Sequence, residues 1–135
     1  MTEVPRLGVR REAREDALAM LYEIELTGDQ PSDALARREV RPDDYCVELV
    51  EAVCSARDVL DRLVSAHLTN WRIERLALVD LCLARMAACE LLERPDVPTG
   101  VVLSELVELS TQYAGADSPR FLNGVLRAVA DTVRG

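Results

Sequence analysis

The stretch LALVDLCLARMAACELL, residues 76–92, decides the fold of this 135-residue chain. It contains no Gly or Pro and consists mainly of Leu, Ala and Met, which are good helix formers. A helix that is hydrophobic on all sides has to be surrounded by other helices. Asp80, Arg85 and Glu90 interrupt the apolar pattern, so each must be paired or lie where the helix meets solvent or a partner. The stretch predicts the central helix of a helical bundle.

Apolar residues spaced three and four positions apart predict further helices on both sides of this stretch. They are expected at residues 9–26, 33–38, 43–68, 99–113 and 119–134, with a short helical turn beginning at Trp71. Gly28 is expected to end the first helix in a left-handed conformation. Ser118 is expected to cap the last helix, with Pro119 at its first position. The prediction is an all-α fold, with residues 1–135 forming a single compact domain of about seven helices.

The same periodicity predicts which side chains face inward. Val59 is expected to lie on the core face of the helix at residues 43–68. Trp71, a large aromatic residue, is expected to be a core anchor between two half-bundles. Asp61 is expected to face water on that helix, and Arg134 to face outward on the last one.

Composition limits the possible functions. The formal net charge is −8, which argues against a protein that coats nucleic acid indiscriminately. All 16 basic residues are arginine, a side chain that binds phosphate in a two-pronged way, although a G+C-rich genome alone would produce this bias. The longest apolar run is interrupted by charges, and the N-terminus lacks the apolar segment of a signal peptide. We therefore expect a cytoplasmic protein without a membrane partner.

No catalytic or metal-binding motif is present in the sequence. It has no HExxH, GxxxxGK[ST] or GxSxG motif, and no GxGxxG after a strand. The four cysteines form no CxxC pair, and His67 is the only histidine, so neither a metal site nor a cofactor is expected. The cysteines are expected to be reduced core residues, and His67 a surface or capping residue. The sequence predicts a protein that is not an enzyme.

Three stretches resemble the NusB family of bacterial transcription antitermination factors. They are RREAREDALAMLYEIE from residue 10, LTNWRIERLALVDLCLARMAACELLERPDVP from residue 68, and LSELVELSTQYAGADSPRFLNGVL from residue 103. The resemblance implies an all-helical fold of two packed half-bundles and a non-enzymatic RNA-binding adaptor. Such adaptors pair with NusE, a ribosomal small-subunit protein, and bind the single-stranded boxA element of nascent RNA. They then join RNA polymerase with other Nus factors and promote transcription of ribosomal RNA.

The resemblance also implies which residues bind. RNA-binding positions are expected at Arg10, Arg11, Arg14, Tyr113, Asp117, Arg120 and Phe121, and an acidic position facing NusE at Asp80. Single-stranded RNA requires cationic groups for phosphate and aromatic faces for base stacking, which these residue types provide. The three arginines would lie near the start of a helix, where cations oppose its dipole, and this hints at a role other than folding.

Each of these residues also has a structural interpretation. The arginines could pair with Glu12 and neighbouring acids on a solvated face, whereas Tyr113 and Phe121 both fit a helical core stripe. Asp117 could repel phosphate or help Ser118 to cap the last helix. Asp80 could form a buried salt bridge with Arg75 or Arg85.

Three positions depart from the family pattern: Glu12, Leu81 and Thr111 stand where relatives carry more positive charge. Fewer phosphate contacts predict weaker RNA binding by the isolated protein and greater reliance on NusE. The alternative is a protein-only interaction module or a homodimeric paralogue that binds little RNA. The sequence leaves the oligomeric state open.

Overall fold

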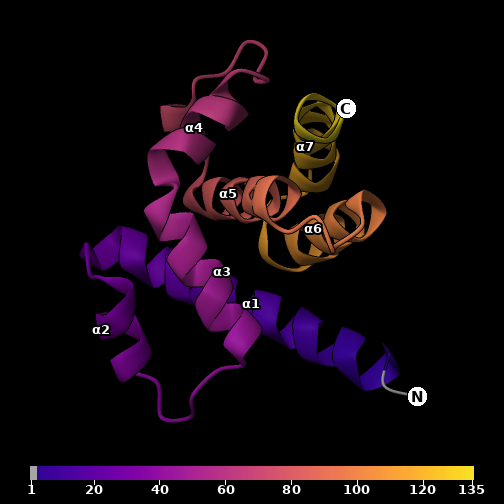
Figure 1. Ribbon diagram of the computed structural model, residues 1–135. Helices are drawn as coiled ribbons and strands as arrows, with labels where there is room; N and C mark the ends of the chain where they lie inside the picture. The colour runs from indigo at the N-terminus through magenta and orange to yellow at the C-terminus, as the bar shows by residue number, and fades with distance from the viewer. Residues whose placement is uncertain (1–2) are drawn as a thin grey trace. The chain divides into compact units, whose positions relative to one another are not determined.

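The structure, a computed structural model, describes the backbone of residues 3–135 and the side chains of residues 10–135. Within residues 3–135 the chain forms seven α-helices, one short 3₁₀ helix (η1) and no strand (Figure 1). The elements are α1 (Glu3–Thr27), α2 (Pro31–Ala36), α3 (Asp44–Ser55), α4 (Arg57–Ser65), η1 (Ile73–Arg75), α5 (Leu78–Glu93), α6 (Thr99–Tyr113) and α7 (Ser118–Arg134). The all-α prediction with about seven helices is confirmed. No helix among the described residues is both long and apolar enough to cross a membrane.

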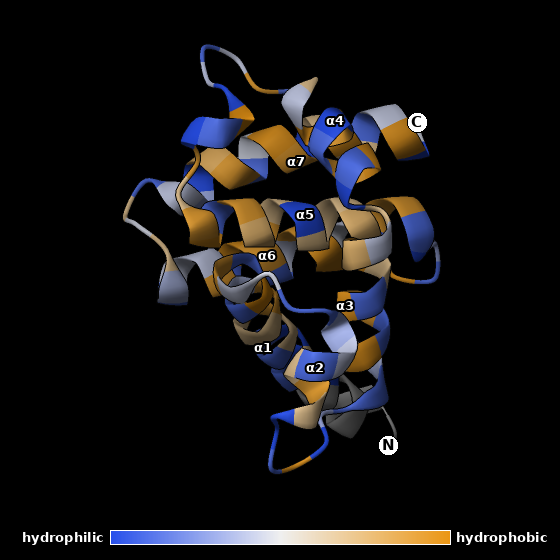
Figure 2. Ribbon diagram, turned by 90° about the vertical axis from the view of Figure 1, so that its left-hand side faces the viewer, coloured by the Kyte–Doolittle hydropathy of each residue, from blue (hydrophilic) through white to orange (hydrophobic). Residues whose placement is uncertain are grey.

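The chain divides into two compact units, residues 1–55 and residues 56–135. In the first unit, α1, α2 and α3 pack against one another in all three pairs. Helix α1 contributes buried Ala17 and Met20, and α3 contributes buried Cys46 and Leu49. The alternation of hydrophobic and hydrophilic residues along α3 is visible in Figure 2. The sulfur atoms of Cys46 and Met20 lie 3.8 Å apart, so α1 and α3 are in direct contact.

The predicted end of the first helix is confirmed. Gly28 has a φ angle of +77°, in the left-handed region that glycine adopts at little cost. Its backbone N–H donates to the Ile24 carbonyl at 2.8 Å and so satisfies one of the last carbonyls of α1.

The single helix predicted at residues 43–68 is wrong, because the chain leaves helical geometry at Ala56. This residue has φ −102° and ψ 15°. Helix α3 ends at the residue before it, and α4 begins at the residue after it. Neither Gly nor Pro marks the break, and the apolar spacing runs through it from Val53 to Leu60. Periodicity therefore could not reveal it. Val59 was predicted to be buried but is 46% exposed, because Leu60 and Val64 occupy the buried side of α4.

Helix α5 is the centre of the second unit, as predicted. It packs against α4, α6 and α7, and every residue from 82 to 91 is buried. The buried Arg85 donates to both carboxylate oxygens of Asp61 on α4, from Nε to Oδ1 at 2.7 Å and from Nη2 to Oδ2 at 2.9 Å. Asp61 was predicted to face water, but it is a counter-ion of this buried arginine and lowers the cost of burying its charge.

Arg134 was predicted to face outward, but its half-buried guanidinium group holds the end of α5. It donates to the carbonyl oxygens of Glu90, Leu91, Arg94 and Val97 at 2.7–3.1 Å and to the Thr99 hydroxyl at 3.1 Å. The last carbonyls of a helix have no partner within the helix, and a guanidinium group offers five donors in a fixed plane. The length of the side chain allows it to reach this ring of acceptors.

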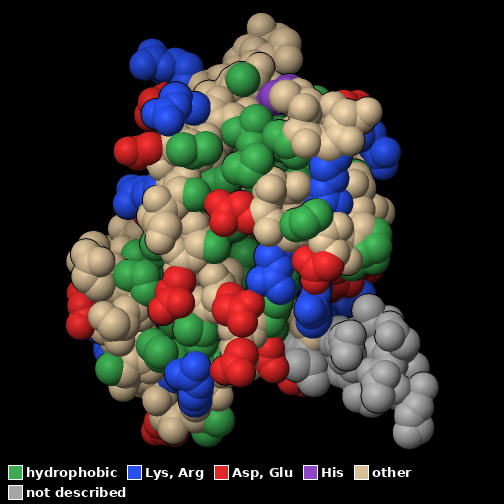
Figure 3. Space-filling view, in the orientation of Figure 1, with side chains coloured by type: hydrophobic (Ala, Val, Ile, Leu, Met, Phe, Trp, Pro, Cys, Tyr) green, Lys and Arg blue, Asp and Glu red, His purple; other side chains and the backbone are tan. Residues whose placement is uncertain are grey.

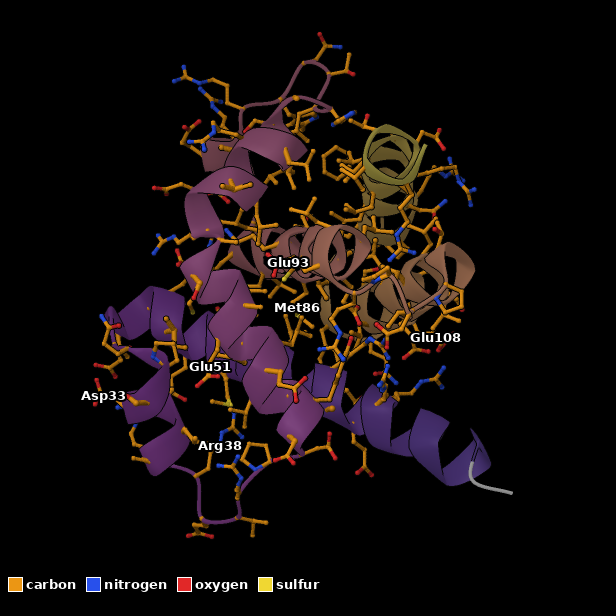
Figure 4. The ribbon with its side chains drawn as sticks, in the orientation of Figure 1. Asp33, Arg38, Glu51, Met86, Glu93 and Glu108 are labelled. Atoms are coloured by element: carbon orange, nitrogen blue, oxygen red, sulfur yellow. The ribbon has the colours of Figure 1, made fainter. Side chains whose placement is uncertain are left out.

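Burial changes the acidity of the Cys46 and Cys89 thiols. Burial raises the pKa of the Cys46 thiol to about 11, and nearby Asp16 adds to the effect. Burial also raises the pKa of the Cys89 thiol to about 12, with a smaller contribution from Glu93, which Figure 4 labels near the end of α5. The unfolded chain has the ordinary thiol pKa of 9.0, so the folded protein keeps these protons to higher pH.

The free energy of unfolding is therefore expected to fall as the pH rises above about 9. Below that pH the contribution of each thiol is fully present. Between about pH 9 and 11 it is lost at about 1.4 kcal/mol per pH unit for each thiol, because only the unfolded state releases the proton. Denaturant titrations between pH 8 and pH 10.5 measure this slope. Cys46→Ala should reduce it by the share of one thiol. Equal slopes for Cys46→Ala and the wild type would contradict the expectation.

Candidate nucleic-acid interface

The second unit contains an open pocket of about 440 Å³ between the ends of three elements. Its walls come from the segment around η1, the start of α5 and the start of α7. The lining residues are Trp71, Arg75, Leu76, Ala77, Asp80, Asp117, Ser118 and Phe121. Three of the residues that the sequence assigned to binding, Asp80, Asp117 and Phe121, are therefore brought together here.

Two aromatic rings stand at this pocket. The centroids of Trp71 and Phe121 are 6.3 Å apart and the ring planes meet at 63°, an edge-to-face pair. Trp71 was predicted to be a core anchor, but its side chain is 53% exposed, whereas Phe121 is half-buried. Phe121 thus packs against an indole ring that remains more than half exposed.

The local backbone explains how the α7 side of the pocket forms. Asp117, not Ser118, holds the N-cap position, and its side chain makes no capping hydrogen bond. Ser118 is buried in the first turn, and its N–H donates to the Gly115 carbonyl at 3.0 Å. The prediction that Ser118 caps the helix is wrong by one residue. The exposed carboxylate of Asp117 therefore makes no hydrogen bond to the helix end, and it lines the pocket.

Asp80 lies in the first turn of α5, where its carboxylate suits the positive end of the helix dipole. Its Oδ1 atom is buried and has no hydrogen-bond partner among the described residues. Arg85, one of the two arginines considered as its partner, pairs with Asp61. A buried acceptor without a donor costs free energy. A hydrogen-bond donor on a ligand or partner would therefore be favourable at Asp80 Oδ1.

The predicted arginines lie in the first unit, on α1. Because α1 begins at Glu3, they occupy the interior of the helix and not its first turn, so the argument from the helix dipole does not apply. Arg11 is exposed, Arg10 is half-buried and Arg14 is 3% exposed. A solvated face therefore does not describe Arg14. The guanidinium carbons of Arg10 and Arg14 lie 4.4 Å and 5.5 Å from the centroid of the Tyr45 ring.

The remaining predicted residues are exposed. Tyr113, near the end of α6, is 51% exposed, so the core interpretation of this side chain is wrong. Arg120 is exposed in the first turn of α7. Both are in the unit that contains the pocket, but neither lines it.

Sequence reasoning missed Trp71, Arg75 and Tyr45 as members of these sites. A signal for Trp71 was available, because it follows Thr69 and Asn70 and precedes the charged stretch RIER, a context that favours exposure. No comparable signal marked Tyr45, because its proximity to α1 depends on the packing of α3.

Charge on the surface is mixed. Figure 3 shows acidic and basic side chains interspersed on the face that it draws. Asp33, Glu51 and Glu108, labelled in Figure 4, come from three different helices and are all exposed. With this mixture of charges on the face drawn and a net charge of −8, an anionic polymer would have to be bound there by a few positioned groups.

Comparison with known proteins gives one consistent result. The sequence profile of the NusB family matches residues 11–131. The transcription antitermination protein NusB of Symbiobacterium thermophilum is 36% identical over 140 residues, covering 93% of this chain and 92% of the relative. Among solved structures, T. maritima NusB has a TM-score of 0.81 at 26% identity, covering 90% of each chain. A crystal structure of the antitermination factors NusB and NusE in complex with double-stranded RNA has a TM-score of 0.80 at 26% identity, covering 93% of this chain and 98% of that one.

Proposed function

Because this chain belongs to the NusB family, we propose that it is a transcription antitermination factor that binds boxA-type single-stranded RNA together with NusE. In this proposal the complex joins RNA polymerase and other Nus factors in the cytoplasm and promotes processive transcription of ribosomal RNA operons. Residues 1–135 work as a single NusB-like RNA-binding domain. The chain acts by binding, without catalysis and without a cofactor.

The observation that carries the proposal is the pocket at Trp71. An exposed indole braced by Phe121, with Arg75 beside it, offers a face for base stacking and a cation for phosphate. Sequence-tolerant stacking on aromatic side chains is the usual way in which proteins hold unpaired bases. We assign the exposed Arg120 and Tyr113 of the same unit to the flanking nucleotides, and Arg10 and Arg11 of α1 to phosphates.

The partner assignment draws on the similar solved structure in which NusB and NusE are bound to RNA together. We assign Asp80 to this partnership, because its buried oxygen awaits a donor and NusE could provide one. Dependence on NusE also follows from the net charge of −8, which weakens RNA binding by the isolated chain.

Trp71→Ala is expected to weaken boxA RNA binding in the presence of NusE by about 5- to 100-fold, the usual worth of one stacked base. Folding should change little because the side chain is 53% exposed. Anisotropy of labelled RNA at two salt concentrations measures the affinity. Because Trp71 is the only tryptophan of the chain, its fluorescence should also be quenched when RNA is added.

The control is Tyr22→Ala, which removes another exposed aromatic ring that lies outside the pocket. It should leave the affinity unchanged. Arg11→Ala should instead reduce the slope of log K against log salt by about 0.7, the value for one phosphate contact with a single strand. A Trp71→Ala variant that binds as tightly as the wild type would refute the stacking role.

A protein-only adaptor or a homodimer with little RNA binding is the second candidate. The net charge of −8 and the burial of Arg14, which removes one of three proposed phosphate contacts, favour it. The same titration separates the two. A stable NusE complex that binds boxA and scrambled RNA equally weakly would select the adaptor.

A further inference from the structure

We infer that Tyr45 is a positioning residue that holds Arg10 ready for a phosphate, while Arg14 supports the same ring from a buried position and does not contact RNA. This inference rests on the proposed function. It assigns different roles to two arginines that the sequence presents as equivalent, and it adds a residue from a different helix.

The Tyr45 ring is fixed by the start of α3. Tyr45 lies in the first turn of α3 and is 6% exposed. Its backbone N–H donates to Asp43 Oδ1 at 2.8 Å, and the Val47 N–H donates to the Asp43 carbonyl at 3.2 Å. Asp43 therefore caps α3 and fixes the backbone that carries the tyrosine. The ring is held by a capped helix end, so it can serve as a fixed support for side chains of α1.

Two arginines lie at the Tyr45 ring. Arg10 and Arg14 are four residues apart on α1, a spacing at which like charges face each other and repel. Their guanidinium carbons lie 4.4 Å and 5.5 Å from the ring centroid, both within cation–π distance. The negative face of an aromatic ring attracts cations, so the Tyr45 ring attracts both arginines.

The two arginines differ in their exposure to solvent. Arg14 is 3% exposed, so a phosphate cannot reach its guanidinium group without a rearrangement of α1. Arg10 is half-buried and still reaches solvent. An arginine that is already ordered loses less side-chain entropy when it binds, and a planar guanidinium group in a fixed orientation suits two-pronged phosphate contact.

The test is a double-mutant cycle on RNA affinity with NusE present, using labelled boxA RNA. Tyr45→Leu should weaken binding by about two- to tenfold, the cost of ordering one long side chain. Tyr45→Phe keeps the ring and should bind like the wild type. Arg10→Ala should also weaken binding, and Tyr45→Leu combined with Arg10→Ala should bind no more weakly than Arg10→Ala alone. Arg14→Met should leave the salt slope unchanged.

A measurement on the unmutated protein covers the case in which Tyr45→Leu does not fold. The side-chain Nε–H of Arg10 should show restricted motion by NMR relaxation before RNA is added, whereas that of the exposed Arg127 on α7 should be mobile. Equal mobility of the two would overturn the inference. Additive effects of Tyr45→Leu and Arg10→Ala, with normal wild-type binding, would overturn the positioning role alone. Failure of wild-type protein and NusE to bind RNA would overturn the proposed function as well.

Discussion

Asp61→Ala is expected to lower the free energy of unfolding by about 3 kcal/mol, the usual cost of removing one partner from a buried ion pair. Arg85 is buried in the central helix, with 7% of its side chain exposed, and loses both hydrogen bonds to the carboxylate of Asp61. The variant therefore leaves a buried guanidinium group without this carboxylate. Denaturant titration at neutral pH measures the loss.

Two further variants make the cause of this loss testable. Asp58→Ala removes an exposed acid from the same helix and should change stability by less than about 0.5 kcal/mol. Asp61→Leu combined with Arg85→Met replaces the pair by apolar side chains and should recover most of the stability lost in Asp61→Ala. A double variant that is less stable than Asp61→Ala would show that the ion pair itself is required.

Arg134→Ala is expected to destabilise the protein by about 3 kcal/mol. The guanidinium group donates to four carbonyl oxygens around the end of α5 and the following turn, and to the Thr99 hydroxyl. A charged donor contributes about 1.5–3 kcal/mol per hydrogen bond, but these bonds share one side chain and their contributions do not add. Thermal unfolding by circular dichroism measures the effect. Hydrogen exchange should locate the loosening at residues 90–99.

Arg127→Ala is the matched control, because Arg127 is exposed on the same helix. Arg127→Ala should change the stability little. Arg134→Lys should have a stability between those of Arg127→Ala and Arg134→Ala, because an ammonium group cannot span all five acceptors. If Arg134→Ala and Arg127→Ala unfold at the same temperature, the carbonyl cluster does not stabilise the fold.

The sequence predicted the helices because hydrophobic spacing is a local property. The uninterrupted apolar stretch at residues 76–92 correctly indicated a helix covered on all sides, and Gly28 correctly indicated the end of α1. The break at Ala56 was missed because both sides keep one apolar spacing and no helix-breaking residue is present. A change of backbone angles at an alanine is decided by what each half packs against.

The candidate site was predicted less completely, since exposure and pairing depend on tertiary contacts. The large aromatic ring of Trp71 favoured a place in the core, but residue type could not show that its loop leaves the indole exposed beside Phe121. The sequence could not choose between Asp61, Asp80 and solvent as the partner of Arg85, because that choice depends on how α4 crosses α5.

By itself, then, the sequence determined the fold class, the central helix and the residue types of the candidate interface. The tertiary structure alone decided which charged side chains are consumed in holding the fold, such as Arg85 and Arg134, and which remain available to a ligand. The physical reason is the separation along the chain of the residues involved. Helical periodicity indicates which face of a segment is apolar. The long arginine side chains instead contact carboxylates, carbonyls and aromatic rings that lie tens of residues away along the chain.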